Sequence, residues 1–133
     1  MRKRFVMMLL GLVWSASPGV KAANQAGVVI QNSTGQVITR CVEFAEDGLP
    51  AVELLRRSGF KHVVQESEGV TMLCFLHDDG SAGCSLHTQG WRWNLFLRES
   101  DEWTRLSTNL SAVSITPGAL MAFTFGPDGT LPP

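Results

Sequence analysis

Two cysteine–histidine pairs of equal spacing are the first candidates for chemistry in this sequence. Cys74 precedes His77 by three positions, and Cys84 precedes His87 by the same interval. Two thiols and two imidazoles form the ligand set of a tetrahedral zinc site. Against that hypothesis, residues three apart on a strand point to opposite faces, and exported thiols tend to be oxidised. We therefore predict no metal site and no cofactor.

The three cysteines instead suggest one disulfide and one remaining thiol. Spacing favours a bridge between Cys74 and Cys84, although sequence alone leaves the connectivity open. A three-residue hairpin loop over residues 78–80 would place the two directly opposite each other. Facing Cα atoms in an antiparallel ladder lie roughly 4.5 to 5.5 Å apart, within disulfide range. We expect Cys41 to be a buried thiol that packs as a small apolar side chain.

Catalytic motifs are otherwise missing from the sequence. Its three histidines have no serine in a Gly-x-Ser-x-Gly elbow near them, and no Gly-x-x-x-x-Gly-Lys loop occurs. Asp78 and Asp79 precede a glycine, which is more typical of a hairpin tip than of an acid–base pair. We predict a protein that is not an enzyme.

The most informative segment is rich in aromatic residues and extends from Gly90 to Arg98, with another tryptophan at position 103. Alternation along a strand places Trp91 and Trp93 on one face and Phe96 on the other. A half-exposed indole is a good platform for a flat or amphipathic ligand. The predicted ligand-binding residues are therefore Trp91, Trp93, Phe96 and Trp103.

An export signal is expected to precede these residues. Basic residues at positions 2–4 are followed by the apolar run FVMMLLGLV and by small residues, as in a signal peptide. The run is shorter than the roughly 20 residues of a membrane span, so we expect no stable span after processing. Cleavage after Ala22 would leave residues 23–133 as one domain that is periplasmic or secreted.

Charge also limits the partners that we expect for the mature domain. The predicted leader contains four of the eleven basic residues and no acidic one, so seven remain against twelve acidic residues. The resulting net charge of about −5 argues against nucleic acid and anionic lipid, which require clustered Lys and Arg.

Hydrophobic periodicity predicts an α+β domain. Residues 27–31 and 36–44 read as a β-hairpin whose core face carries Ile38, Val42 and Phe44. Residues 49–59 have proline where a helix begins and glycine where it ends. Later strands are expected at 62–65, 70–77, 83–87, 91–98, 103–106, 112–116 and 120–125. Such an order predicts a β-grasp-like mixed sheet packed on one short helix.

The sequence also resembles a known family. Matching pieces cover most of residues 23–133 in order: Thr39–Phe44, the helix 48–59, Val70–Cys74 with Gly83–Cys84, the Trp91/Trp93 strand, Trp103–Thr104 and the closing Pro117–Gly126. They are similar to the bacterial exported domain of unknown function that is like the C-terminal domain of transcobalamin and intrinsic factor, in the soluble-ligand-binding β-grasp group. Further cysteines and tyrosines common in that family are missing here.

Two binding hypotheses follow from these observations. The resemblance implies a β-grasp fold and a small amphipathic ligand, with a corrinoid such as cobalamin as the candidate. The alternative is a protein-interaction module that docks on an exported or membrane partner by adding a strand to a sheet edge.

Overall fold

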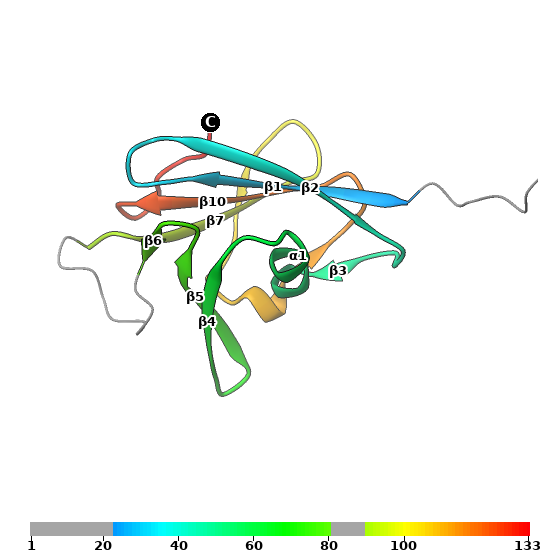
Figure 1. The fold of residues 1–133 in the computed structure, drawn as a ribbon, viewed down its shortest axis with the longest axis horizontal. Helices are drawn as coiled ribbons and strands as arrows, with labels where there is room; N and C mark the ends of the chain where they lie inside the picture. The colour runs from blue at the N-terminus through cyan, green and yellow to red at the C-terminus, as the bar shows by residue number, and fades with distance from the viewer. Residues whose placement is uncertain (1–22, 81–89) are drawn as a thin grey trace, which may run out of the picture.

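The computed structural model describes residues 23–80 and 90–133. The predicted signal peptide (residues 1–22) and the predicted strand at 83–87 lie outside the described residues. Within the described ranges, the chain is a mixed α+β structure with one α-helix, as predicted. Its strands form a five-stranded main sheet of order β2-β1-β10-β7-β8, a two-stranded sheet of β3 and β9, and a three-stranded sheet of β4, β5 and β6 (Figure 1).

The N-terminal hairpin consists of β1 (Asn24–Gln31) and β2 (Val37–Phe44). The side-chain Oδ1 of Asn32 fixes its turn by accepting from the N–H groups of Thr34 and Gln36 at 3.1 and 2.8 Å. The strand starts earlier than predicted, because residues 24–26 also pair with β2 and Asn24 lies opposite Phe44.

The centre of the main sheet joins the two ends of the described chain. Strand β1 pairs in parallel with β10 (Leu120–Gly126), and β10 pairs antiparallel with β7 (Arg92–Arg98). The short strand β8 (Thr104–Arg105) closes that side of the sheet, while β2 forms the opposite edge. A hairpin whose first strand pairs in parallel with the last strand, with a helix packed below, is the predicted β-grasp arrangement.

Helix α1 (Ala51–Arg57) follows β3 (Leu49–Pro50) and covers the inner face of the main sheet. Pro50 precedes the first helical residue, where its missing N–H costs nothing. Gly59 follows the helix with φ +76°, a conformation that glycine adopts without steric cost. The apolar face of the helix packs into the core, where Ala51, Leu54 and Leu55 are fully buried.

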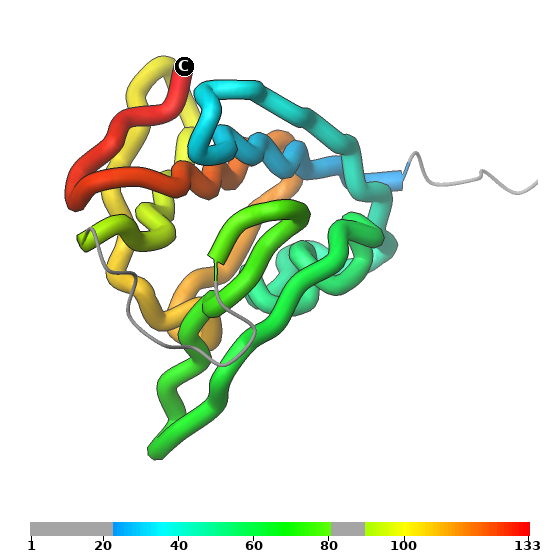
Figure 2. Tube along the Cα trace, turned by 60° about the vertical axis from the view of Figure 1, so that its left-hand side comes forward, coloured from blue at the N-terminus to red at the C-terminus, as the bar shows by residue number. Residues whose placement is uncertain are grey.

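A second layer lies on the same side of the main sheet as α1 (Figure 1). It contains β4 (His62–Ser67), β5 (Val70–Leu76) and β6 (Asp79–Gly80), together with the 3₁₀ turn Leu110–Ala112 and β9 (Ser114–Ile115), which pairs with β3. The core between the layers includes Leu54, Leu76, Leu95, Leu110 and Phe123. In Figure 2 the C-terminal segment after β10 folds back beside the main sheet.

The β5–β6 turn differs from the predicted hairpin loop. Leu76 pairs with Asp79 and Phe75 pairs with Gly80, so the turn consists of His77 and Asp78. His77 has φ +61°, which a residue with a side chain rarely adopts. The predicted loop over residues 78–80 is therefore wrong. Because Cys84 lies outside the described residues, the bridge itself stays a prediction.

Candidate functional site

The four predicted ligand-binding residues lie on two different faces of the main sheet. Trp91 and Trp93 contact the core on the inner face, whereas Phe96 and Trp103 belong to a small apolar cluster on the outer face. The alternation predicted for the strand is correct. It places Trp91 and Trp93 on the opposite side of the sheet from Phe96. The structure therefore contains two aromatic groups and does not bring the four residues into one site.

The inner group is centred on Phe125. The Trp93 ring lies 4.9 Å from the Phe125 ring, and the Trp91 ring meets the same ring edge-on at 5.9 Å, measured between centroids. Trp93 is buried, while Trp91 is only partly buried. The indole Nε1–H of Trp93 is buried without a hydrogen-bond acceptor. An unsatisfied buried donor costs about 1 to 3 kcal/mol.

The outer group is built around Phe96, which packs with Val29 and Ala122. Trp103 covers this cluster, and its Nε1–H donates to the main-chain oxygen of Pro133 at 3.3 Å. The guanidinium of Arg98 lies 5.0 Å from the Trp103 ring centroid, in cation–π range. Trp103 thus has protein partners at its ring and at its N–H. This cluster buries Phe96 on the outer face of the sheet.

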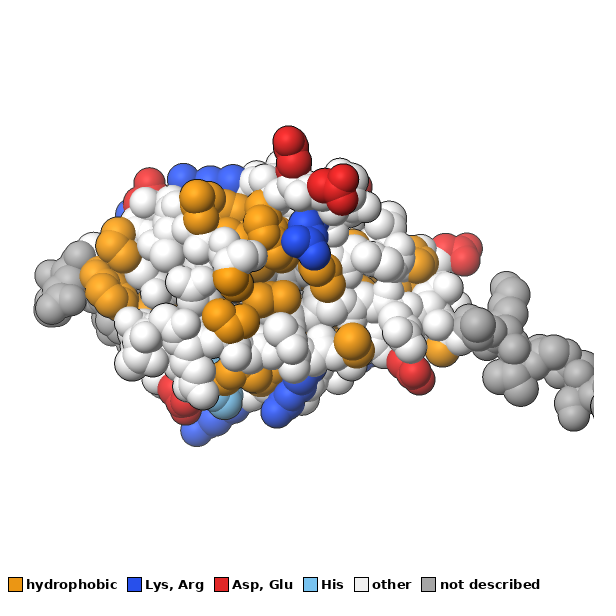
Figure 3. Space-filling model, turned by 90° about the horizontal axis from the view of Figure 1, so that it is seen from above, with side chains coloured by type: hydrophobic (Ala, Val, Ile, Leu, Met, Phe, Trp, Pro, Cys, Tyr) orange, Lys and Arg blue, Asp and Glu red, His pale blue; other side chains and the backbone are white. Residues whose placement is uncertain are grey.

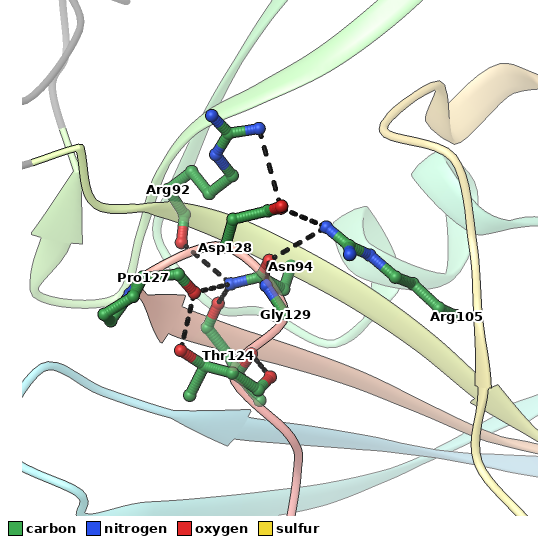
Figure 4. Close-up of polar contacts among 8 residues, drawn as sticks. Arg92, Asn94, Arg105, Thr124, Pro127, Asp128 and Gly129 are labelled. Carbon is green, nitrogen blue, oxygen red and sulfur yellow. Dashed lines mark hydrogen bonds and ion pairs between the residues drawn. The ribbon is translucent and has the colours of Figure 1, made fainter.

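Hydrogen bonds from the side chains of Asn94 and Thr124 hold the turn after β10 (Figure 4). Asn94 is buried, and its Nδ2 donates to main-chain oxygens of Arg92, Thr124 and Pro127 at 3.4, 3.4 and 3.1 Å. The Thr124 hydroxyl donates to the main-chain oxygen of Thr130 at 2.6 Å. Such saturated hydrogen bonding is typical of structural residues.

Two arginines surround the acid of the same turn. Arg105 pairs with Asp128, and Arg92 lies 3.6 Å from the same carboxylate oxygen. The hydrogen bond from Arg105 lowers the pKa of Asp128. Asp128 neutralises much of the local positive charge, so we assign this cluster to the fold and not to an anion site.

The edge of the main sheet that β2 forms is a second candidate site. The N–H of Asn32 donates to the main-chain oxygen of Gln36 at 3.0 Å, which marks these two as a hydrogen-bonded pair of the hairpin. Such pairs alternate along an antiparallel ladder. The polar main-chain groups of Ile38, Arg40 and Val42 therefore bond β1.

The intervening residues of β2 direct their main-chain groups away from the sheet. These residues are Val37, Thr39, Cys41 and Glu43. A bond on the other side of β1 agrees with this alternation. Gly27 lies opposite Cys41, and its N–H donates to Ala119 on the β10 side, so Gly27 and Cys41 do not bond each other through their main chains. No backbone hydrogen bond reaches the outer edge of β2 within the described part of the chain. In Figure 2, β2 runs along the border of the molecule.

Cys41 lies in the middle of this edge strand. Its thiol is free and exposed, so the expectation of a buried Cys41 is wrong. The physical reason is alternation: Val42 and Phe44 face the core, and Cys41 points to the outer face with Val37, Thr39 and Glu43. Figure 3 views this outer face, where apolar side chains are interspersed with polar ones. Val37 adds to it an apolar side chain that is 43% exposed.

The remaining titratable groups of the described ranges do not gather into a metal-binding group. There, no group of three or more His, Cys, Asp and Glu side chains could hold a metal ion. Hydrogen bonds from Arg57 lower the pKa values of Glu46 and Glu53, and all three side chains lie at the surface around α1. No helix in residues 23–80 and 90–133 is both long and apolar enough to span a membrane.

Comparison of the chain with protein-family models finds no match, and comparison with curated proteins finds none either. The aromatic residues of the sequence do not indicate which strand forms the edge of the main sheet. The signal for β2 was nevertheless visible in the sequence, as eight consecutive strand residues without proline or glycine.

Proposed function

We propose that this chain is a non-catalytic binding domain that recognises a polypeptide by strand addition at β2. The observation that carries the proposal is the uninterrupted edge of Val37–Phe44, whose outward main-chain groups have no partner in the described residues. Natural proteins usually block such an edge with proline, bulges, lysine or a covering loop. Strand β2 contains no proline or lysine, and its pairing with β1 continues without a bulge. Its two charged residues are Arg40, which bonds Ser58, and Glu43, which accepts from Gln25.

Strand addition would use the main chain for affinity and alternate side chains for specificity. An added strand would extend the outer face beside Val37, Thr39 and Cys41, all of which point to that side. On the inner side, Arg40 is already held by the main-chain oxygen of Ser58 at 3.0 Å. The outer face is therefore the side on which a partner gains new side-chain contacts.

The test uses one substitution that removes an outward N–H and one that does not. Thr39→Pro deletes the donor at the centre of the edge, where the N–H makes no bond to β1, and Thr39→Val is the matched control. After thermal melts show that both fold, each is used to capture partners from an extract of the native host. The proposal expects a captured protein that Thr39→Pro loses and Thr39→Val keeps. Equal capture by both variants would overturn it.

A second candidate function is binding of a small amphipathic ligand, for which the resemblance implies a corrinoid such as cobalamin. The partly buried indole of Trp91 favours it, because that ring offers an aromatic surface beside Phe125. Titration calorimetry with cyanocobalamin, repeated on Trp91→Phe, tests this candidate. Absence of heat together with unchanged indole N–H resonances would exclude it.

We also propose that the domain acts outside the cytoplasm, in the periplasm or after secretion. The basic and apolar residues of the first 22 positions support this location. N-terminal sequencing of the protein from fractionated host cells should give Ala23 as the first residue. Recovery in the cytoplasm with Met1 retained would contradict the proposal.

A further inference from the structure

We propose that the partner of β2 is a second copy of this chain, bound antiparallel so that Cys41 lies directly opposite Cys41 of the second copy. The inference rests on strand addition at β2 and names the occupant of that edge. It would join two main sheets into one continuous sheet around a two-fold axis, with both outer faces on the same side.

Alternate residues of β2 bond β1, and this alternation restricts how two copies can pair. Within the described residues, only the odd-numbered residues of β2 present unpaired main-chain groups at the edge, so odd residues must face odd residues across a new ladder. Strand β2 extends from Val37 to Phe44. Two symmetric registers then give the greatest overlap: one pairs residues 37–43 about Arg40, and the other pairs residues 38–44 about Cys41.

Charge decides between these two registers. The register centred on Arg40 places that guanidinium directly opposite its own copy, and like charges in facing positions destabilise a sheet. The register centred on Cys41 places Arg40 opposite Val42 and Glu43 opposite Thr39 of the second copy. Arg40 and Glu43 are the only charged residues of β2. No like charges then face each other directly, and we infer this register for the dimer.

The selected register also gives the exposed thiol a partner. Hydrogen-bonded antiparallel pairs have Cα atoms about 5.5 Å apart, close to the usual separation in disulfides. Cys41 is free, and in an oxidising compartment an odd cysteine is a candidate for an intermolecular bridge. Backbone phase and charge select the register without reference to the cysteine, so the meeting of the two thiols is a separate argument for a second copy.

Oxidation of the pair balances by thiol–disulfide exchange. A Cys41 thiolate attacks a disulfide oxidant such as oxidised glutathione, and one glutathione thiol leaves. The second Cys41 thiolate then attacks the mixed disulfide and displaces the other glutathione thiol. The two Cys41 thiols lose two protons and two electrons, which the two released thiols carry away.

The first experiment measures assembly and cross-linking of the protein expressed from its full sequence. We expect light scattering to show a concentration-dependent dimer, for wild type and for Cys41→Ser alike. With oxidised glutathione, wild type should give a covalent dimer and Cys41→Ser should not. Peptide mapping should find a Cys41–Cys41 bridge. A wild type that stays monomeric at all concentrations and forms no such bridge would overturn the proposal.

A second experiment tests the register itself in the Cys41→Ser background. Thr39→Cys and Glu43→Cys variants should each cross-link poorly alone, because neither position faces its own copy. Mixed together, they should form a covalent heterodimer about tenfold faster than either alone, because Thr39 faces Glu43 across the interface. Faster cross-linking of Thr39→Cys alone would show a different register and would overturn the one proposed.

Failure of this inference can be told apart from failure of strand addition. If wild type is monomeric but Thr39→Pro still abolishes capture of a different protein, then β2 binds a foreign strand and the self-pairing is wrong. If Thr39→Pro neither changes capture nor reduces dimerisation, both the self-pairing and strand addition at β2 are wrong.

Discussion

The main-chain N–H of Gly129 donates a hydrogen bond to the side-chain Oδ1 of Asn94 at 2.9 Å. This bond joins the turn after β10 to the middle of β7, which β10 itself pairs with. Because Nδ2 of the same side chain serves three carbonyl oxygens, one amide fixes the turn from several directions. This one buried side chain therefore attaches the turn after β10 to β7.

Asn94→Leu should destabilise the domain by about 3 kcal/mol, because it leaves buried carbonyl and N–H groups without partners. Chemical denaturation measures this loss, and hydrogen exchange should show faster exchange of the Gly129 amide. The control is Thr124→Val, which removes one hydroxyl bond, to Thr130, and should cost about 1 kcal/mol. Equal losses in the two variants would contradict the central role of Asn94.

The ion pair at Asp128 should make the same turn sensitive to acid. Its pKa is lowered by Arg105, so the stabilisation is complete above the ordinary aspartate pKa of about 3.9 and is lost as pH falls through the lowered value. Asp128→Asn should melt below wild type at neutral pH by a small amount, because the pair is exposed. We expect the two melting curves to converge as the pH falls through the lowered pKa of Asp128. A difference that grows on acidification would contradict this assignment.

The two tryptophans with different Nε1 environments should respond differently to the same substitution. Trp93→Phe removes an unsatisfied buried donor, and the relief of about 1 to 3 kcal/mol offsets the lost apolar contact. We expect a net change in unfolding free energy within about 1 kcal/mol. The matched variant Trp103→Phe loses the bond to Pro133, and exchange near the C-terminus should quicken. A loss above about 3 kcal/mol in Trp93→Phe would indicate that its N–H has a partner.

Gly80 should tolerate no side chain. A Cβ placed there would lie 2.1 Å from the main-chain oxygen of Cys74, and φ is +105°. Gly80→Ala should therefore cost more than about 3 kcal/mol, by overpacking together with backbone strain. Gly69→Ala is the control, since Gly69 also has positive φ but nothing within 4 Å of its Cβ position. It should cost about 1 kcal/mol. Equal costs would show that strain alone limits both sites.

Alternation and turn chemistry were sufficient to predict most of the main sheet. The hairpin, α1, β7 and β10 follow from β-branched runs, Pro50 and Gly59, because these signals act locally. The turn at His77 was missed, since the Asp79–Gly80 pair carried a stronger turn signal and His77 adopts a conformation that its residue type disfavours.

The candidate sites were harder to predict because they depend on segments distant in sequence. Burial of Phe96 requires Trp103 and the C-terminal residues to cover the outer face, which no local pattern predicts. The exposure of Cys41, by contrast, follows from the two-residue alternation of a strand. Val42 faces the core, so its neighbour Cys41 points to the other face of the sheet together with Thr39.

The parallel pairing of β1 with β10 also determines when this domain can fold. Its central strand partners come from the first and last parts of the described chain, so β1 has no partner on that side until residues 120–126 have been synthesised. Contacts between such distant residues slow folding, because a long loop must close before they form. An emerging polypeptide therefore lacks this central strand pairing until residues 120–126 have left the ribosome.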